Sequence, residues 1–267
     1  TGTVYIRADG SIEPPDAPII TFDNITYTLN DNISSYADGI VVERDNIILD
    51  GACYTIQGNR EQNHVGIRLF ERNNVTIKNV KIDNFHIGVD IYRSSNIMFI
   101  RNEISNNGYG IYLHISCNNT INNNVIVNNS YGIYIPSDYS EYIFSWIETA
   151  VRNIILNNEI KENEVGAVIE GANNTLRENL IVGNKLGVQL DSGCAKFFVG
   201  NIRFAGNITL KAIGIVLTNN EMGMLVSSST QLRKNRFQKN SFNLGICVDP
   251  YNSWFEYKNI CLLYTSP

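Results

Sequence analysis

The sequence predicts an all-β solenoid in which each coil takes about 22 residues. Three observations predict it: glycines recur at a fixed interval, short stretches of alternating apolar and polar residues follow each glycine, and asparagines recur where each repeat closes. The first four anchoring glycines, each 22 positions after the one before, are Gly66, Gly88, Gly110 and Gly132. A unit of this length holds about three short strands, which have no core of their own and must stack on neighbouring units.

The stretch after each glycine has the two-residue period of a strand rather than the period of a helix. Its apolar pairs are Ile67 and Leu69, Val89 and Ile91, Ile111 and Leu113, Ile133 and Ile135, Ala167 and Ile169, Val188 and Leu190, Met224 and Val226, and Ile246 and Val248. A second strand is marked by Ile77 and Phe99, and a third by Ile82, Ile104 and Ile126. Stacked coils would fill the interior with like residues lying above one another.

Two steps in the glycine series are longer than the period. The series resumes at Gly166, Gly187, Gly223 and Gly245, with 34 positions from Gly132 to Gly166 and 36 from Gly187 to Gly223. We therefore expect insertions near 137–150 and 192–214. Both follow the post-glycine strand, and both contain aromatic residues, among them Trp146 in the first. Long loops on a rigid scaffold often carry function, although these aromatic residues could equally pack the insertions onto the coils.

The asparagines mark the corners of the coils. The pattern N-x-[IVF]-x-x-N occurs at 102–107, 124–129, 158–163, 179–184 and 235–240. Asparagine tolerates left-handed backbone conformations, which suits tight turns, and stacked asparagine side chains can also hydrogen-bond from coil to coil. A structural role is therefore expected, with ligand binding as the alternative.

Three segments resemble a known family. "DGIVVERDNIILDG", "NNVTIKNVKI" and "SNNGYGIYL" are similar to the NosD-like, CASH-type repeats of exported archaeal and bacterial proteins, over roughly residues 36–250. The resemblance implies a single-stranded right-handed parallel β-helix. We expect residues 1–35 to form N-terminal capping strands that cover the open edge and 36–260 to form the helix. The last seven residues, "CLLYTSP" (261–267), resemble a translated sequencing adapter and are expected to be non-native.

Composition and sequence motifs narrow the class of protein. The formal net charge of −5 and the lack of a basic run argue against a nucleic-acid binder, and no apolar run reaches the length of a membrane span. No spacing of Cys or His indicates a metal site. Seven N-x-[ST] sequons favour an exported or cell-surface protein; their asparagines are Asn24, Asn32, Asn74, Asn118, Asn128, Asn173 and Asn207. We expect it to be a monomer.

Residues that alternate with the buried ones should point outward and form columns about 4.8 Å apart from coil to coil. One column contains Arg68, Asp90, Tyr112 and Tyr134, and the next contains Phe70, Tyr92, His114, Glu170 and Asp191. Aromatic faces beside hydroxyl and carboxylate groups suit sugars. The candidate substrate-binding residues are Asp90, Tyr92, Tyr112, His114, Tyr134 and Trp146.

Glu170 and Asp191 share a column in successive coils, so their carboxyl groups are expected about 5 Å apart, which is near the separation in retaining glycosidases. Like charges at that distance raise one pKa, which would give an acid beside a base. These two residues are the candidate catalytic pair. The same pair could instead hold Ca²⁺ together with backbone carbonyls, or "LDSG" could simply be a turn that begins at Asp191.

Three functions remain open. The resemblance implies binding of polysaccharide or a cell-surface glycan, with processing by a hydrolase, lyase or epimerase activity. A structural or adhesive surface module without chemistry is the alternative. A periplasmic copper-binding accessory protein is the third, although copper sites favour clusters of Cys, Met or His, and the three His and three Met here are scattered.

Overall fold

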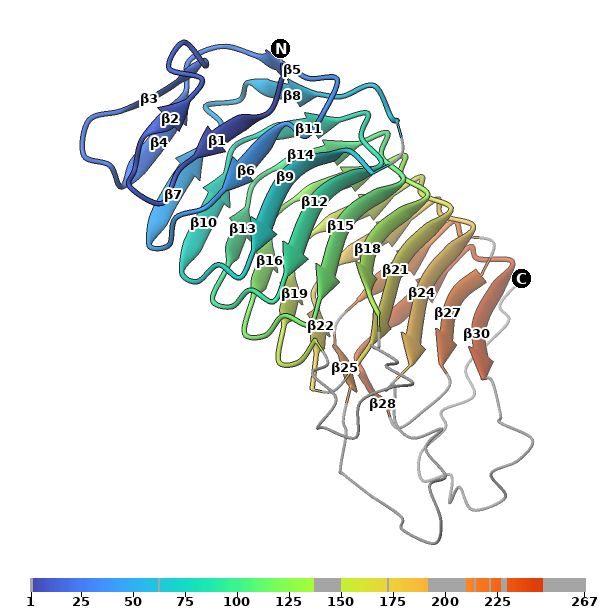
Figure 1. The fold of residues 1–267 in the computed structure, drawn as a ribbon. Helices are drawn as coiled ribbons and strands as arrows, with labels where there is room; N and C mark the ends of the chain where they lie inside the picture. Colours follow the sequence, from blue (N-terminus) through green and yellow to red (C-terminus); the bar gives the residue numbers. More distant parts are fainter. Residues whose placement is uncertain are drawn as a thin grey trace, which may run out of the picture.

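The computed structural model describes residues 2–61, 63–136, 150–171, 173–191, 210–213, 215–220, 222–226 and 230–246. All regular elements of this part are β-strands, and they form three long sheets that run along one solenoid (Figure 1). Almost every coil contributes one strand to each sheet, and neighbouring coils pair in parallel. The predicted right-handed parallel β-helix is confirmed. No helix that could span a membrane occurs among these residues.

Sheet A has 11 strands, in the spatial order β2 (Ile12–Glu13), β1 (Val4–Ile6), β6 (Ile40–Val42), β9 (Val65–Phe70), β12 (Ile87–Tyr92), β15 (Tyr109–His114), β18 (Tyr131–Ile135), β21 (Val165–Glu170), β24 (Leu186–Asp191), β27 (Met222–Val226) and β30 (Phe242–Ile246). Sheet B has 10, namely β3 (Ile19–Thr21), β4 (Thr26–Leu29), β7 (Ile47–Asp50), β10 (Val75–Lys78), β13 (Met98–Ile100), β16 (Thr120–Asn122), β19 (Ile154–Leu156), β22 (Thr175–Arg177), β25 (Leu210–Ile213) and β28 (Thr230–Arg233). Sheet C has nine, namely β5 (Ile33–Ser34), β8 (Thr55–Gln57), β11 (Lys81–Asp83), β14 (Glu103–Ser105), β17 (Val125–Val127), β20 (Glu159–Lys161), β23 (Leu180–Val182), β26 (Val216–Thr218) and β29 (Arg236–Gln238).

The register follows the glycine period, so equivalent positions stack. In sheet A, Val89 pairs with Ile67 on one side and with Ile111 on the other. These side chains are fully buried, as are the corresponding residues of sheets B and C, such as Phe99 and Ile104. Burying an aliphatic or aromatic side chain stabilises a fold by about 1.5–3 kcal/mol. The repeated apolar columns are therefore the main source of stability.

The anchoring glycines lie where successive coils come closest. A Cβ atom at Gly110 would lie 2.5 Å from the carbonyl oxygen of Gly132, which is too close for any side chain. The glycine also interrupts the alternation of the strand. Burial along β15 reads half-buried, buried, buried, half-buried, buried, half-buried, with Gly110 and Ile111 as consecutive buried residues. This interruption decides which residues face outward.

The asparagines of the N-x-[IVF]-x-x-N pattern form buried ladders inside the corners. Asn124 is representative: its Nδ2 donates to the carbonyl of Phe99 (2.9 Å) and to Oδ1 of Asn158 (3.0 Å). Its Oδ1 accepts from the backbone N–H of Asn102 (2.9 Å) and from Nδ2 of Asn102 (3.1 Å). Such bonds satisfy backbone groups that the turns would otherwise leave unpaired. The expected hydrogen bonding from coil to coil is confirmed.

The left-handed turn residues are the residues just before these ladders, not the ladder asparagines themselves. Asn123, Asn128 and Asn157 have φ values near 55°, and each precedes a buried ladder asparagine. Arg101 and Glu162 occupy the same kind of position with φ values of 56° and 57°. We expected the patterned asparagines to take left-handed conformations, but at these corners the left-handed residue comes one position before the ladder asparagine. The buried side chain must point inward, and the exposed one before it makes the turn.

At the N-terminal end, two sheets gain an antiparallel strand. β2 pairs antiparallel with β1, and β3 pairs antiparallel with β4, while β1 and β4 pair in parallel with the next coil through β6 and β7. Both added strands are only two or three residues long. Short terminal strands of this kind offer little edge for pairing with another chain.

Candidate functional site

The outer face of sheet A brings five of the expected binding residues together. Asp90 pairs with Tyr112, and Tyr112 pairs with Tyr134, in one column of successive coils. Tyr92 pairs with His114 in the neighbouring column. All five side chains lie on the outer face, where the burial pattern leaves them half-buried.

The rings of this face stack on one another along the helix axis. The ring centroids of Tyr112 and Tyr134 are 5.5 Å apart with an interplanar angle of 13°. Tyr92 and His114 stack at 5.0 Å, and Phe70 lies 5.3 Å from Tyr92. Tyr112 and His114, 5.5 Å apart, join the two columns into one continuous surface. Stacked and tilted pairs at these separations are favourable arrangements for aromatic rings.

Three further rings belong to this surface and were not expected from the sequence. Tyr109 and Tyr131 stack at 5.1 Å with an interplanar angle of 9°, and Tyr109 also lies 5.5 Å from Tyr112. His86 meets Tyr109 edge to face at 5.9 Å. Strict alternation back from Ile111 would turn Tyr109 inward, but the interruption at Gly110 turns it outward. The recurring Tyr-Gly dipeptides at 109–110 and 131–132 were the sequence signal that could have predicted the outward position of Tyr109.

We call this surface the aromatic face; it consists of Phe70, His86, Tyr92, Tyr109, Tyr112, His114, Tyr131 and Tyr134. Side chains stand roughly perpendicular to a sheet, so tyrosines stacked in this way turn their ring faces toward one another. The aromatic face therefore presents ring edges, and each tyrosine carries its hydroxyl group at the far end of the ring. After β18 the two tyrosine columns continue as Val165 and Val168, and the aromatic face ends.

Asp90 lies beneath this surface rather than open on it. Only 14% of its side chain is exposed, and Nη1 of Arg68 lies 3.6 Å from its Oδ2. The other side of Arg68 contacts Asp38, with Nε 3.0 Å from Oδ2. Burial raises the pKa of the Asp90 carboxyl, against the lowering effects of Arg68 and His114. This carboxyl group is thus poised closer to neutral pH than an ordinary aspartate.

Glu170 and Asp191 pair with each other in β21 and β24, in the register that the sequence predicts. The side chain of Asp191 lies outside the described part, so the distance between the two carboxyl groups stays a prediction. Glu170 is half-buried and lies near the end of the aromatic face. Burial raises the pKa of the Tyr134 hydroxyl, and the charge of Glu170 raises it further.

The two insertions fall largely outside the described residues. Trp146 and the rest of 137–149 lie there, as do residues 192–209, so their expected place beside the aromatic face is not described. Residues 210–213, which the sequence assigns to the second insertion, form β25 of sheet B. Within the described part, no group of three or more His, Cys, Asp or Glu side chains is placed to hold a metal ion.

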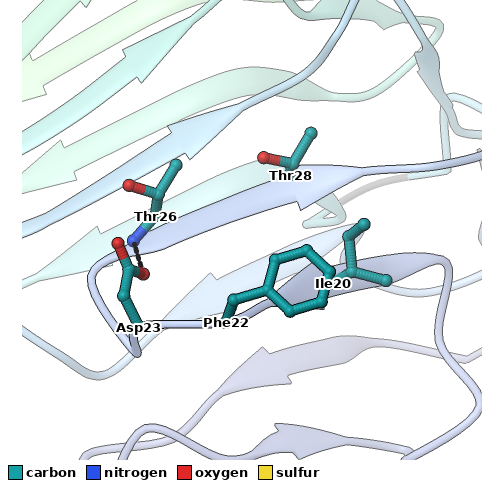
Figure 2. Close-up of a pocket in the computed structure, with 5 residues that line it drawn as sticks. All are labelled: Ile20, Phe22, Asp23, Thr26 and Thr28. Carbon is teal, nitrogen blue, oxygen red and sulfur yellow. Dashed lines mark hydrogen bonds between the residues drawn. The ribbon is translucent and has the colours of Figure 1, made fainter.

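A small pocket of about 200 Å³ lies near the N-terminal end of the solenoid, on the β3–β4 hairpin (Figure 2). It is lined by Ile20, Phe22, Asp23, Thr26 and Thr28. The Asp23 carboxylate already accepts the backbone N–H groups of Thr26 (2.7 Å) and Ile25 (2.9 Å), which fixes the turn between the strands. The one acidic group of this pocket therefore has a structural role.

Comparison with known proteins agrees with the architecture. The family model described as "Right handed beta helix region" matches residues 16–145 and 45–209, and the chain belongs to this family. No curated protein matches the sequence.

Solved structures with similar folds include the periplasmic alginate epimerase AlgG, with 20% identity and a TM-score of 0.56 over 74% of this chain and 47% of that one. The Streptococcus pneumoniae surface protein and adhesin PfbA gives 11% identity and a TM-score of 0.52 over 83% of this chain and 68% of that one. The A-module of the Azotobacter vinelandii mannuronan C-5 epimerase AlgE6 gives 12% identity and a TM-score of 0.50 over 94% of this chain and 90% of that one. At these identities the similarity shows the fold alone, and the chain spans about half the length of AlgG.

Proposed function

We propose that this β-helix is an exported or cell-surface protein that binds a neutral polysaccharide along the aromatic face of sheet A. The observation that carries the proposal is the continuity of that face, in which eight rings from successive coils touch one another at 5.0–5.9 Å. Contiguous apolar groups on the outer face of a fold often mark a binding site.

The repeat of the face suits a polymeric ligand. Coils are about 4.8 Å apart, a spacing close to the length of one sugar unit in an extended chain. A polysaccharide that runs parallel to the helix axis would then meet an equivalent set of ring edges and hydroxyl groups at every unit. Hydroxyl groups of the sugar can pair with tyrosine hydroxyls, while its C–H surfaces lie against the aromatic edges.

The charges near the face favour a neutral ligand over an anionic one. Each nearby arginine among the described residues already has a carboxylate partner: Arg68 has Asp38 and Asp90, Arg72 has Asp45, and Arg93 has Glu71. Alginate, the polymer named for the similar structure of AlgG, is a polyanion, and its carboxylates would meet no unpaired arginine among the described residues near the face.

Processing of the bound chain would rest on Glu170 and Asp191, as acid and base or as Ca²⁺ ligands. Their pairing in successive strands supports this part of the proposal.

A structural or adhesive surface role without chemistry is the second candidate. It is favoured by the stacking of the rings on one another, which stabilises the solenoid whether or not a ligand is present. Copper binding in the manner of NosD-like proteins is the third, and no described cluster supports it.

The test incubates the full chain with neutral and anionic soluble polysaccharides, with and without Ca²⁺, and records binding and new chain ends together. Binding of neutral glycans is expected. Products that disappear in Glu170→Gln and Asp191→Asn would make the protein an enzyme and place its chemistry at that pair. Binding without products would make it a binding module, and no binding to any glycan would leave the structural or adhesive role.

A further inference from the structure

One corner of the solenoid, where the strands of sheet B begin, has a repeating feature that the proposed function does not use. In the first coil this corner is the turn of the β3–β4 hairpin, and in the later coils it is the turn that leads from sheet A to sheet B. Successive coils place one exposed residue with positive φ at this corner, two positions before the first outward residue of the sheet B strand. The residues are Asn24, Asn46, Asn74, Asn96, Asn118, Arg152 and Asn173. We call this row the acceptor corner.

The outward residue that follows alternates along the row. Thr26 pairs with Ile48, Ile48 with Thr76, and Thr76 with Met98. Met98 then pairs with Thr120, Thr120 with Ile154, and Ile154 with Thr175. N-x-T sequons therefore occur on every second coil, at Asn24, Asn74, Asn118 and Asn173, and the coils between have none. Two coils span about 10 Å, so the four acceptors are evenly spaced along one edge.

From this arrangement we propose that Asn24, Asn74, Asn118 and Asn173 are acceptors for N-linked glycans, which line one edge of the solenoid. All four side chains are exposed, so an attached glycan extends into solvent without displacing the core. The amide groups at this corner bond to neighbours at the surface rather than to the core: Nδ2 of Asn74 donates to Oδ1 of Asn46 (2.9 Å), and Nδ2 of Asn118 donates to Sγ of the half-buried Cys117 (3.7 Å). This inference rests on the exported location proposed above and is independent of glycan binding by the aromatic face.

The attachment needs a donor that an export pathway supplies, a polyprenyl-diphosphate-linked oligosaccharide, and a transferase that uses it. The Asn Nδ2 attacks C1 of the first sugar, a C1–N bond forms, and the C1–O bond to the diphosphate breaks. The amide proton passes to a base of the transferase, and polyprenyl diphosphate leaves. The fold only has to accommodate the product, and the exposed corner does so.

The other sequons occupy different positions. Asn32 is exposed, but its Oδ1 accepts the backbone N–H of Thr55 (2.8 Å), and Asn128 lies on another corner, where its Nδ2 donates to Oδ1 of Asn106 (2.6 Å). Asn207 lies outside the described residues. The four corner sequons are thus distinguished by their alignment, not by the motif alone.

The alternation also suggests what the glycans do. On the coils between the acceptors, the same column carries Met98 and Ile154, whose side chains are 45% and 42% exposed. Glycans on the flanking coils would shield these apolar groups and keep the outer face of sheet B from associating with another molecule.

The experiment secretes the full chain through the endoplasmic reticulum of a eukaryotic host and maps modified asparagines by mass spectrometry after enzymatic removal of N-glycans. Occupancy at Asn24, Asn74, Asn118 and Asn173 in secreted, folded protein is expected. Thr76→Val and Thr120→Val keep a β-branched side chain and should abolish modification at Asn74 and Asn118, whereas Thr76→Ser should keep it.

Ile48→Thr is the sharpest matched variant, because it completes a sequon at Asn46 on an intervening coil. Crowding at one-coil spacing should then lower occupancy at Asn24 or Asn74. The enzymatically deglycosylated protein should also aggregate at lower concentration than the glycosylated form. Unmodified corner sites in secreted protein, or modified chains that fail to fold, would overturn the inference.

Discussion

Two kinds of side-chain ladder run along this solenoid, one inside its corners and one on the outer face of sheet A. In the inner ladder the same residue type recurs for coil after coil, as in Asn102, Asn124, Asn158 and Asn179, and each amide bonds the next. In the outer ladder the residue changes from Arg68 to Asp90 and then to Tyr112 and Tyr134. A buried polar group must find a partner in the next coil, so its identity is fixed, whereas an outward residue is free to vary.

The contrast between the fixed inner ladder and the variable outer ladder indicates where function can be sought in a repeat protein. Positions that the repeat fixes report on the fold, and those that it leaves free can be adapted to a ligand. Aromatic residues concentrate in the free columns over four successive coils, β9, β12, β15 and β18. The comparison can be tested by removing one member of each ladder.

The largest loss of stability is expected from the inner ladder. Asn124→Ala removes two donated and two accepted hydrogen bonds and takes away the acceptor of the buried Asn102 backbone N–H. Unsatisfied buried groups cost about 1–3 kcal/mol each, so the free energy of unfolding should fall by about 3 kcal/mol or more. Denaturant unfolding measures it.

Asn123→Gly is the control for that variant. Asn123 is exposed, has a φ of 55° and precedes the ladder residue, and glycine adopts this conformation readily. Its free energy of unfolding should change by no more than about 0.5 kcal/mol. Equal losses in the two variants would contradict the division between ladder and turn asparagines.

For the stacked rings on the outer face of sheet A, a smaller effect is expected. Tyr109→Leu keeps an apolar side chain but removes the ring that stacks on Tyr131 and contacts Tyr112. Aromatic pairs contribute about 0.5–1.5 kcal/mol beyond area burial, so we expect a loss of about 1 kcal/mol in unfolding experiments. Tyr36→Leu, at a site 75% exposed and outside the face, is the control and should be near neutral. A loss at Tyr109 as large as that of Asn124→Ala would remove the contrast between the ladders.

Asp90 gives a prediction about pH. Its pKa is raised in the folded protein, chiefly by burial, so folding disfavours the ionised form and stability falls as pH rises through that pKa. Asp90→Asn should therefore raise the free energy of unfolding at neutral pH. The gain should shrink as the pH is lowered toward 3.8, the ordinary value for the carboxyl. Arg68 keeps Asp38 as its partner in the variant.

Asp50→Asn should show the opposite sign. Burial would raise the pKa of Asp50, but the Ala52 N–H, Asn79 and Lys78 outweigh it and hold the pKa below its usual value. The ionised form is thus favoured by folding, and this stability is present above pH 3.8 and lost as the pH falls through the lowered pKa. The asparagine variant should lose stability at neutral pH. Thermal unfolding of both variants between pH 3 and pH 7 checks the pair, and curves with the same sign would refute it.

Much of this molecule follows from its sequence, because the 22-residue period sets the register of the strands from β9 to β18 in all three sheets. The glycines, the apolar columns and the ladder asparagines are all consequences of that period. Several features could not be predicted in this way, and two of them show why. Tyr109 faces outward because the strand alternation is interrupted at Gly110, and Asp90 is covered because Arg68 of the preceding coil reaches it. Both depend on backbone shape and side-chain reach between coils, which residue patterns within a coil do not contain.

Binding along the aromatic face is tested most directly by titrating the protein with neutral oligosaccharides of increasing length, using wild type and the double variant Tyr112→Phe/Tyr134→Phe. The variant keeps the stacked rings and loses two hydroxyl groups. If the ligand runs along the aromatic face, affinity should rise with each added sugar unit and level off when the oligosaccharide spans about the four coils that carry the rings. Affinity should fall about tenfold in the variant, which is equivalent to the loss of one hydrogen bond of about 1.4 kcal/mol. An affinity that changes neither with oligosaccharide length nor with loss of the two hydroxyl groups would contradict binding along the aromatic face.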